Sequence, residues 1–426
     1  MLYTNILKNN YQDSINLMRL TKEINSLNQV NKSQIMMGTD ANKEILQTSN
    51  LLTDEAKQAK PNDLIIVVDA NNKSTIDEVM KKIDNSLSDL STQKNNLSTK
   101  EVSNLDDALE ELPEANMGLF SIAGEYAVPE IKKALDKGLH VFSFTDNISL
   151  EDEVSLKKIA KEKGLLMMGP DCGTGIISGT PLAFTNAVKP GNIGIVAASG
   201  TGIQEVTTII DRLGGGVLHA IGTGGRDLKG EIGAITTKEA IVGLENDDKV
   251  EVICLISKPP AKEVRDDVYK LLQSLSKPVV AIFLGENPES HEGNVYLAHT
   301  LDEAARITVD LANNNEIKSI YLDDIIHDAG ERRTSDKEVV GLYSGGTLAE
   351  EAKMMISESS SLELVQKDGY ILHSKDYKII DLGDDEYTRG RPHPMIDPQT
   401  RIDKIKEYAN KDGVGTILLD VVLGYG

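Results

Sequence analysis

The chain has 426 residues, or about three domains at roughly 150 residues each, and its 40% hydrophobic and 26% charged residues are typical of a folded protein rather than a collagen-like or disordered one. Its 67 acidic residues against 45 basic ones give a net charge of -22. This charge argues against a protein held on nucleic acid or anionic lipid through phosphate contacts, so an anionic substrate would require a local site.

The first 113 residues are expected to form a small α+β module rather than a polar tail. They are rich in Asn, Ser, Lys and Gln, but the apolar run at 64–68 is flanked by turn-forming residues and predicts a strand. Between 74 and 87, apolar residues recur at every third or fourth position, which predicts a helix.

From residue 117 onward, short apolar runs alternate with amphipathic segments, which predicts the order β-α-β-α-β and a Rossmann-like domain over 114–186. The family resemblance described below implies that this domain is of the CoA-binding type. Strands that are apolar on both faces indicate a parallel sheet covered on both sides. Pro129 suits the first turn of the first helix, while Gly138 and Gly164 suit the positive-φ positions just past two helix ends. The segments are, in chain order, 119–123, 128–135, 139–144, 150–159 and 165–168.

The same pattern restarts at Gly191 and predicts a second doubly wound domain over 187–315, the ligase-type domain of the family described below. A buried strand at 193–198 leads into a glycine-bearing turn and then a helix with one apolar face. Further strands are predicted at 217–221, 250–256 and 278–284.

A third set of elements follows a polar connector and predicts a domain over 335–426. The sequence ends just after a strand at 416–422, where an α/β sheet normally continues into a covering helix. We therefore expect either an incomplete domain or a sheet completed by another chain, with a terminal edge strand as the alternative. The fold class predicted for the whole is multidomain α/β, with doubly wound parallel sheets of the Rossmann-like and flavodoxin-like kinds and a small amino-terminal α+β module.

The strongest candidate site follows the strand at 193–198. There Ser199, Gly200, Thr201 and Gly202 stand at a helix start, where freed backbone amides, two hydroxyls and the positive end of the helix favour an anion such as phosphate or carboxylate. The alternative is that a hydroxyl merely caps the helix.

A second glycine-rich loop follows the next strand and is therefore expected at the same edge of the same sheet. It contains Gly224 and Gly225 as candidate anion ligands, Arg226 as a candidate catalytic group with planar donors, and Asp227 as a candidate Mg²⁺ ligand or partner of the arginine. The alternative is an Arg-Asp surface pair in a tight turn.

A third loop repeats the pattern in the last domain, with Gly345, Gly346 and Thr347 as candidate anion ligands. Two helix ends from different domains would then converge on one charged group, in a water-poor site where fixed dipoles act strongly on developing negative charge.

The densest basic cluster of this acidic chain is a loop with Arg389, Arg391 and His393, which is either a substrate-binding loop or a rigid solvent-exposed one. Cys172 follows a strand, but no histidine partner is near it in the sequence, so a buried bystander thiol is favoured over a nucleophile. No metal site is predicted.

The expected compartment is the cytoplasm. Two cysteines without a C-x-x-C pair indicate a reducing environment, the start lacks the apolar region of a signal peptide, and no run approaches the ~18 apolar residues of a membrane span.

Several segments taken in order resemble the succinyl-CoA synthetase α-chain family, most closely its FdrA-type branch. They are GEYAVPEIKKALDKGLHVFSFTDNISLEDE, GPDCGTG, KPGNIGIVAASGTGIQE, GTGGRD and LISKPP. The segment YSGGTLAEE resembles the carboxy-terminal domain of the synthetase β-chain, here fused, and MMGTDANKEIL near the start also resembles the FdrA-type branch. The resemblance implies an acyl-CoA synthetase (succinyl-CoA ligase)-like enzyme that works through an acyl phosphate, with coenzyme A and Mg²⁺ as possible cofactors.

In that family a phosphohistidine is held between two helix amino-termini, and the matching positions here are Ser199–Gly202 and Gly345–Thr347. The histidine motif itself, a Gly-His-Ala-Gly-type turn, is not found, and Lys258 stands where the family has a glutamate that contacts the histidine. An ammonium serves an oxyanion rather than an imidazole, so the phosphoryl relay is expected to be lost and Lys258 becomes a candidate catalytic residue. The Gly-rich opening turn of the family also has no counterpart in residues 1–113, which weakens the expectation of coenzyme A.

Three functions follow from these residues and the resemblance. The first is the synthetase-like enzyme, and the second is a subunit of an oxamate carbamoyltransferase that uses carbamoyl phosphate in purine (allantoin) catabolism, as is associated with FdrA-type proteins. The third is a non-catalytic subunit that senses an anion. The expected partners are a small acyl or carbamoyl phosphate and either further copies of the chain or other subunits, with neither nucleic acid nor membrane.

Overall fold

The computed structural model divides the chain into two compact units, of which the first ends at Val102 and the second holds the described residues from Asn104 onward. The structure describes residues 2–10, 12, 14–27, 29–96, 102, 104–122, 124–145, 147–286, 291–317, 337–359, 363–388 and 393–422.

The first unit is a small α+β module, as predicted. Its central strand is β3, and β1 and β2 pair with it on either side in an antiparallel sheet. The residues of β3 are almost all buried because α1 and α4 cover one face of the sheet, while α2 and α3 contribute to the apolar cluster on the other. The elements are β1 (Leu2–Leu7), α1 (Ser14–Asn25), β2 (Val30–Met37), α2 (Asp40–Thr48), α3 (Asp54–Lys57), β3 (Leu64–Ala70) and α4 (Lys73–Asn96).

The second unit begins with a parallel sheet of order β4-β5-β6, which confirms the predicted β-α-β-α-β order. Gly138 and Gly164 have the expected positive φ, of 82° and 65°. The prediction for Pro129 is wrong, because the helix begins at Gly124 and the proline lies in its second turn. The elements are α5 (Leu105–Glu111), β4 (Met117–Phe120), α6 (Gly124–Asp136), β5 (His140–Ser143), α7 (Leu150–Glu162) and β6 (Met167–Met168).

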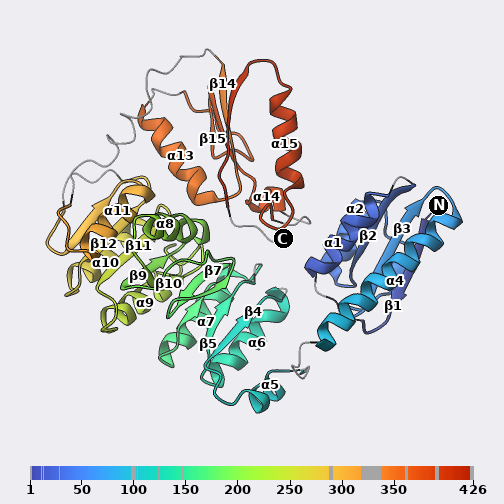
Figure 1. Ribbon diagram of the computed structural model, residues 1–426, viewed down its shortest axis with the longest axis horizontal. Coiled ribbons are helices and arrows are strands. Elements are labelled where there is room, and N and C mark those ends of the chain that lie inside the picture. The colour runs from blue at the N-terminus through green and yellow to red at the C-terminus, as the bar shows by residue number, and fades with distance from the viewer. Residues whose placement is uncertain are drawn as a thin grey trace. The chain divides into compact units, whose positions relative to one another are not determined.

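The central sheet has the order β13-β12-β11-β9-β10-β7-β8, in which β9 to β13 are parallel and in flavodoxin-like order. Helices α8 and α11 pack on one face and α9 and α10 on the other (Figure 1). The antiparallel hairpin of β7 and β8 extends the sheet beyond β10. The elements are β7 (Thr174–Ile177), β8 (Thr180–Ala183), β9 (Ile193–Ala197), α8 (Gly200–Arg212), β10 (Val217–Gly222), α9 (Ile235–Glu245), β11 (Val252–Ser257), α10 (Lys262–Gln273), β12 (Val279–Phe283), β13 (Val295–Ala298) and α11 (Leu301–Ala312).

The last sheet has the order β15-β16-β14-β17, with β14 parallel to both β16 and β17. Its strand order therefore reverses at β14, again as in a doubly wound fold. The elements are β14 (Glu338–Tyr343), α13 (Gly346–Ser359), β15 (Leu372–His373), β16 (Tyr377–Asp381), α14 (Asp385–Thr388), α15 (Gln399–Ala409) and β17 (Val414–Leu418).

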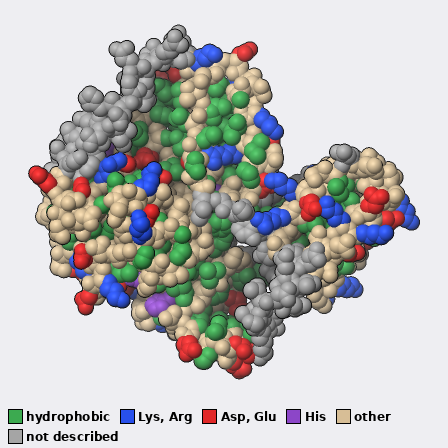
Figure 2. Space-filling model, viewed as in Figure 1, with side chains coloured by type: hydrophobic (Ala, Val, Ile, Leu, Met, Phe, Trp, Pro, Cys, Tyr) green, Lys and Arg blue, Asp and Glu red, His purple; other side chains and the backbone are tan. Residues whose placement is uncertain are grey.

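The surface view shows basic side chains that lie singly or in small groups among acidic and neutral ones on the face drawn (Figure 2). Of the helices that the structure describes, none has both the length and the apolar character needed to cross a bilayer.

Candidate functional site

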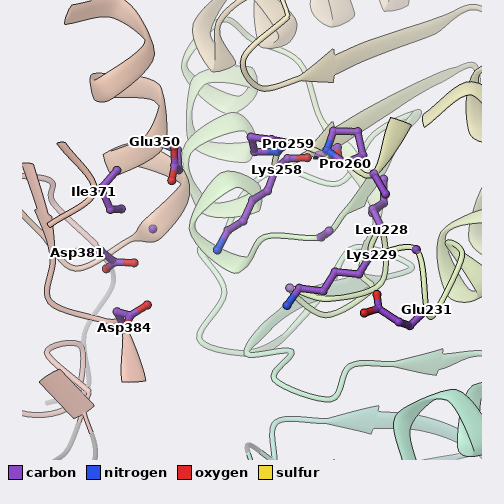
Figure 3. A pocket seen from close by; sticks show the side chains of 16 residues that line it. Leu228, Lys229, Glu231, Lys258, Pro259, Pro260, Glu350, Ile371, Asp381 and Asp384 are labelled. Carbon is purple, nitrogen blue, oxygen red and sulfur yellow. Dashed lines mark hydrogen bonds between the residues drawn. The ribbon is translucent and has the colours of Figure 1, made fainter. Parts of the chain in front are cut away.

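A cavity opens at the switch point of the central sheet, the place where the strand order reverses between β9 and β11. Ligands of doubly wound sheets bind outside the carboxyl ends of the strands at this point. The cavity has a volume of about 630 Å³ and lies between the ends of β9, β10 and β11 on one side and α13 and β16 on the other (Figure 3). The lining residues that matter below are Ala198, Gly225, Ser257, Lys258, Gly346, Glu350, Asp381 and Asp384.

Two of the predicted anion loops meet beside this cavity. Ser199 caps α8 by accepting a hydrogen bond from the backbone N–H of Gly202 at 2.9 Å, and its Oγ also lies 2.5 Å from Thr347 Oγ1 in a hydrogen bond between the two hydroxyls. Both side chains are buried. A Cβ built on Gly345 would lie 2.8 Å from Thr201 Oγ1, so only glycine fits where the loops touch. The structure thus brings the amino-termini of α8 and α13 together.

The loop before α13 is held by a carboxylate that the sequence analysis missed. Asp420 accepts hydrogen bonds from the backbone N–H groups of Ser344 at 3.0 Å and Gly345 at 2.8 Å, and Arg401 pairs with Asp420 at 2.7 Å. The Gly345 amide, a candidate anion donor, is therefore already engaged, whereas the helix start at Gly346 faces the cavity. The position of Asp420 just after β17, at the switch point of the last sheet, is the signal that predicts such a contact.

Lys258 and Asp381 face the same point of the cavity from opposite sides (Figure 3). A Cβ built on Gly346 would lie 3.2 Å from Lys258 Nζ and 2.6 Å from Asp381 Oδ2. Among the residues that the structure describes, none forms an ion pair with Lys258 within 4.0 Å. Burial raises the pKa of Asp381 to about 6, although the Gly383 amide and the Lys258 ammonium act in the other direction. Asp381 was not a predicted site residue. The sequence feature that could have indicated it is an acidic residue at the end of β16, the strand that pairs with β14.

The loop after β10 contributes less to the cavity than the sequence suggests. Gly225 lines it, and Gly224 has a φ of 87° with its would-be Cβ only 2.4 Å from the Pro170 carbonyl oxygen, so this loop needs glycine for its close approach. Arg226 and Asp227 are not among the described residues that line the cavity.

Both side chains have partners elsewhere. Arg226 donates to Ile148 O at 2.8 Å and pairs with Glu153 at 2.7 Å, rather than with Asp227. Asp227 is fully buried and accepts from Lys157 at 2.7 Å and from the N–H and hydroxyl groups of Thr237 at 2.8 and 2.7 Å. The expectation that Asp227 holds Mg²⁺ or orients Arg226 does not fit this geometry, because its oxygens are engaged by these donors.

The remaining candidates lie away from the cavity or outside the described residues. Arg389 and Arg391 fall outside the part of the chain that the structure describes. His393 accepts a hydrogen bond from the Met395 amide through Nδ1 at 3.1 Å, and burial lowers its pKa. A Cβ built on Gly383 would lie 2.5 Å from His393 Nε2 and 3.2 Å from Asp381 Oδ1, and His393 is not among the described residues that line the cavity. Burial raises the pKa of Cys172 to about 12, which agrees with an inert thiol.

Three protein families match parts of the chain. A CoA binding domain matches residues 188–285, a CoA-ligase domain matches 342–426, and a domain described as "AllF, heavy metal-associated domain" matches 1–104. Soft metal ions take thiolate, thioether or imidazole ligands, and residues 1–104 contain neither Cys nor His. The amino-terminal module therefore lacks the thiolate and imidazole ligands of a heavy-metal site.

Among characterised relatives, the α subunit 2 of an ADP-forming succinate–CoA ligase from Archaeoglobus fulgidus is 28% identical over 40% of this chain and 60% of that subunit. The α subunit of malate–CoA ligase from Methylorubrum extorquens is 26% identical over 40% of this chain and 59% of that subunit. This chain thus spans less than two thirds of these subunits. Solved structures that match include the ATP citrate lyase from Methanothrix soehngenii in complex with citrate and coenzyme A, with a TM-score of 0.41 and 15% identity over 56% of this chain and 48% of that one.

One relative covers nearly the whole chain. The uncharacterized protein YahF of Escherichia coli K12 is 40% identical over an alignment of 439 positions, which covers 99% of this chain and 84% of that protein. The chain therefore belongs to the family of YahF, and it combines CoA-binding and CoA-ligase domains with homology to succinyl-CoA synthetase α subunits.

Proposed function

We propose that the cavity binds the phosphate group of an acyl phosphate and that the chain is an acyl-CoA synthetase-like enzyme, in which this group lies between the amino-termini of α8 and α13. The observation that carries this proposal is the contact between the two helix starts, through Ser199 and Thr347, at a cavity that also receives the Lys258 ammonium.

The electrostatics of the cavity support an anionic guest. The first N–H groups of a helix have no partner within the helix, and they carry about half a positive charge at its amino-terminus. Two such termini meet here, and Lys258 adds a full positive charge without an ion-pair partner among the described residues. These groups are fixed in place by the fold, so they stabilise negative charge on an oxyanion without reorganising when it binds.

Coenzyme A is proposed as the acyl acceptor. The CoA binding domain match spans both strand ends that form the floor of the cavity, Ala198 after β9 and Ser257 at the end of β11. The phosphohistidine relay is proposed to be absent, since no histidine lies among the described residues that line the cavity and Lys258 faces the helix termini instead. No Mg²⁺ ligand is proposed.

A second candidate is carbamoyl transfer by an FdrA-type oxamate carbamoyltransferase subunit. Carbamoyl phosphate is itself an acyl phosphate, so the same helix termini would hold its phosphate group. Lys258 favours this alternative, because an ammonium at the cavity stabilises a departing phosphate directly and no covalent intermediate on histidine is required.

The proposal is tested by the binding of inorganic phosphate and acetyl phosphate to the full chain, measured by isothermal titration calorimetry. Lys258→Ala should weaken the affinity by about 10-fold or more, the usual value of a hydrogen bond to a charged group. The matched control is Lys262→Ala, which removes the same charge from an exposed position four residues further on and should leave the affinity unchanged. Equal affinities in the wild type and in both variants would contradict the proposed site.

Turnover separates the two candidates. Acetyl transfer from acetyl phosphate to coenzyme A supports the synthetase-like enzyme, and carbamoyl phosphate consumption with oxamate supports the transferase. Phosphate binding without either reaction supports the anion-sensing subunit. A stable acid-labile phosphoprotein formed from labelled ATP would contradict the proposed loss of the histidine relay.

A further inference from the structure

The cavity contains a carboxylate at the very place where the proposed anion would lie. Asp381 is the last residue of β16, opposite Tyr343 on β14, and this register sets it beside the start of α13. Its Oδ2 is the atom that lies closest to a Cβ built on Gly346. An ionised carboxylate here would repel the anion that Lys258 and the helix termini attract.

The two oxygens of Asp381 have different surroundings. Oδ1 accepts a hydrogen bond from the Gly383 amide at 2.9 Å, whereas no donor to Oδ2 is found within hydrogen-bonding distance among the described residues. Oδ2 is thus the oxygen that is available to carry a proton and donate it to a guest in the cavity.

The charges around Asp381 come from each element packed against it. Lys258, on the loop after β11, favours the ionised carboxylate, while Asp384, in the turn after β16, and Asp420, after β17, disfavour it. The imidazole of His393 lies beside Gly383, and Glu350 on α13 lines the same cavity. Burial outweighs the Lys258 ammonium and raises the pKa of Asp381 to about 6. A bound anion would raise this pKa further, because a like charge disfavours the ionised form.

We propose that Asp381 makes anion binding proton-linked: it takes up one proton when an oxyanion enters the cavity and donates it as a hydrogen bond from Oδ2 to that anion. This role rests on the proposed anion site and specifies its chemistry. The cavity then accepts an oxyanion such as phosphate or an acyl phosphate together with a proton, and it selects against anions when the carboxylate is ionised. A carboxylic acid kept neutral by its surroundings is a hydrogen-bond donor, which an ionised carboxylate is not.

The test uses sulfate as the probe, because sulfate keeps a constant charge over the pH range of interest whereas phosphate does not. Its affinity for the full chain is measured by calorimetry from about pH 5 to about pH 8, and proton uptake is obtained from buffers of different ionisation enthalpy. For the wild type we expect the affinity to fall at least 10-fold over this range, with net uptake of a proton on binding above pH 6.

Two variants separate the roles of the neighbouring carboxylates. Asp381→Asn should bind sulfate with an affinity that changes less than 2-fold with pH, should take up no proton, and should bind at least 10-fold more tightly than the wild type at about pH 8. The matched control is Asp384→Asn, which removes the same charge from an exposed residue of the same cavity. It should still show the fall in affinity and the proton uptake, displaced toward lower pH because Asp384 no longer disfavours the ionised Asp381.

The results that would contradict the proton linkage differ from those that would contradict the anion site. Sulfate binding that is independent of pH in the wild type, or equally pH-dependent in Asp381→Asn, would overturn the proton linkage while the anion site stands. The absence of sulfate binding at every pH, in the wild type and both variants, would overturn the anion site itself and the linkage with it.

Discussion

Two loops of the central sheet share a sequence pattern but adopt different structures. Both follow parallel strands, β9 and β10, and both are rich in glycine. The loop after β9 places Ser199 against Thr347 of α13, beside the cavity. The loop after β10 instead turns Arg226 and Asp227 toward α7, where Glu153 and Lys157 bind them. A glycine-rich turn after a strand therefore allows a loop to bind a ligand. Whether its side chains remain available for that ligand depends on the charged residues packed nearby.

The ion cluster that closes the second loop is deeply buried. The side chains of Glu153, Lys157 and Asp227 are fully buried, and Lys157 also donates to Thr223 O at 2.9 Å. Charges removed from water need partners of opposite sign, and Arg226 and Lys157 balance the two carboxylates. This cluster joins α7 to the start of α9, because the Thr237 amide and hydroxyl bind the same Asp227 carboxylate.

The largest effect is expected when this cluster is broken. Lys157→Met leaves Glu153 and Asp227 buried with too few cations, so we expect a loss of about 3–5 kcal/mol in the free energy of unfolding. Denaturant unfolding measures the loss, and amide hydrogen exchange in α7 and α9 locates it.

The matched control lies one turn further along the same helix. Lys161 pairs with Glu239 at the surface, with side chains 52% and 37% exposed, so Lys161→Met should cost about 0–1 kcal/mol. If the two variants lost the same stability, the buried cluster would not be what closes the loop after β10.

A smaller effect is expected on the side of the open loop, where a buried carboxylate of α13 joins this helix to α11. Glu351 of α13 accepts a hydrogen bond from the Leu301 amide at the start of α11, at 2.7 Å. Burial raises the pKa of Glu351 from the usual 4.5 to about 7, so the folded state binds a proton that the unfolded state releases. The stability from this proton is fully present below pH 4.5 and is lost as the pH rises through 7.

Glu351→Gln should remove this pH dependence. The variant keeps an acceptor for the Leu301 amide, and above pH 7 it should be more stable than the wild type by about 3 kcal/mol. Denaturant unfolding at a series of pH values measures the difference, with Glu350→Gln, which changes the adjacent residue, as the control. A Glu351→Gln profile that still falls between pH 4.5 and 7 would show that another group links α13 to α11.

The sequence predicts the elements that carry local patterns and the loops that follow them. Ser199 and Thr347 were found because glycine and hydroxyl residues after a buried strand are a local signal. Asp420 and Arg401 were missed, since Asp420 reaches the Ser344 amide across 76 positions of the sequence. The hairpin of β7 and β8 was also missed, because its strands have only four residues each.

The partners of charged side chains also could not be predicted from the sequence, because they come from distant segments of the chain. Arg226 has the donors expected of a phosphate ligand, but its partner Glu153 comes from α7, a different segment of the chain. No pattern around residue 226 indicates that a buried carboxylate lies beside Arg226. Glu153 meets Arg226 because α7 packs against α9. Asp381 was missed for a related reason, since its role depends on the register of β16 against β14.

The smallest effect is expected from Arg226, which the sequence made a candidate catalytic group with donors suited to an anion. Arg226→Gln should change the affinity for inorganic phosphate less than 2-fold, because Glu153 and the Ile148 carbonyl already hold the guanidinium away from the cavity. Ser199→Ala, by contrast, removes the hydroxyl that fixes both helix termini, and it should weaken phosphate binding by about 1 kcal/mol, or roughly 5-fold. Calorimetry on the folded variants makes the comparison. Equal losses in both would mean that Arg226 leaves Glu153 when the anion binds, and the loop after β10 would then belong to the site after all.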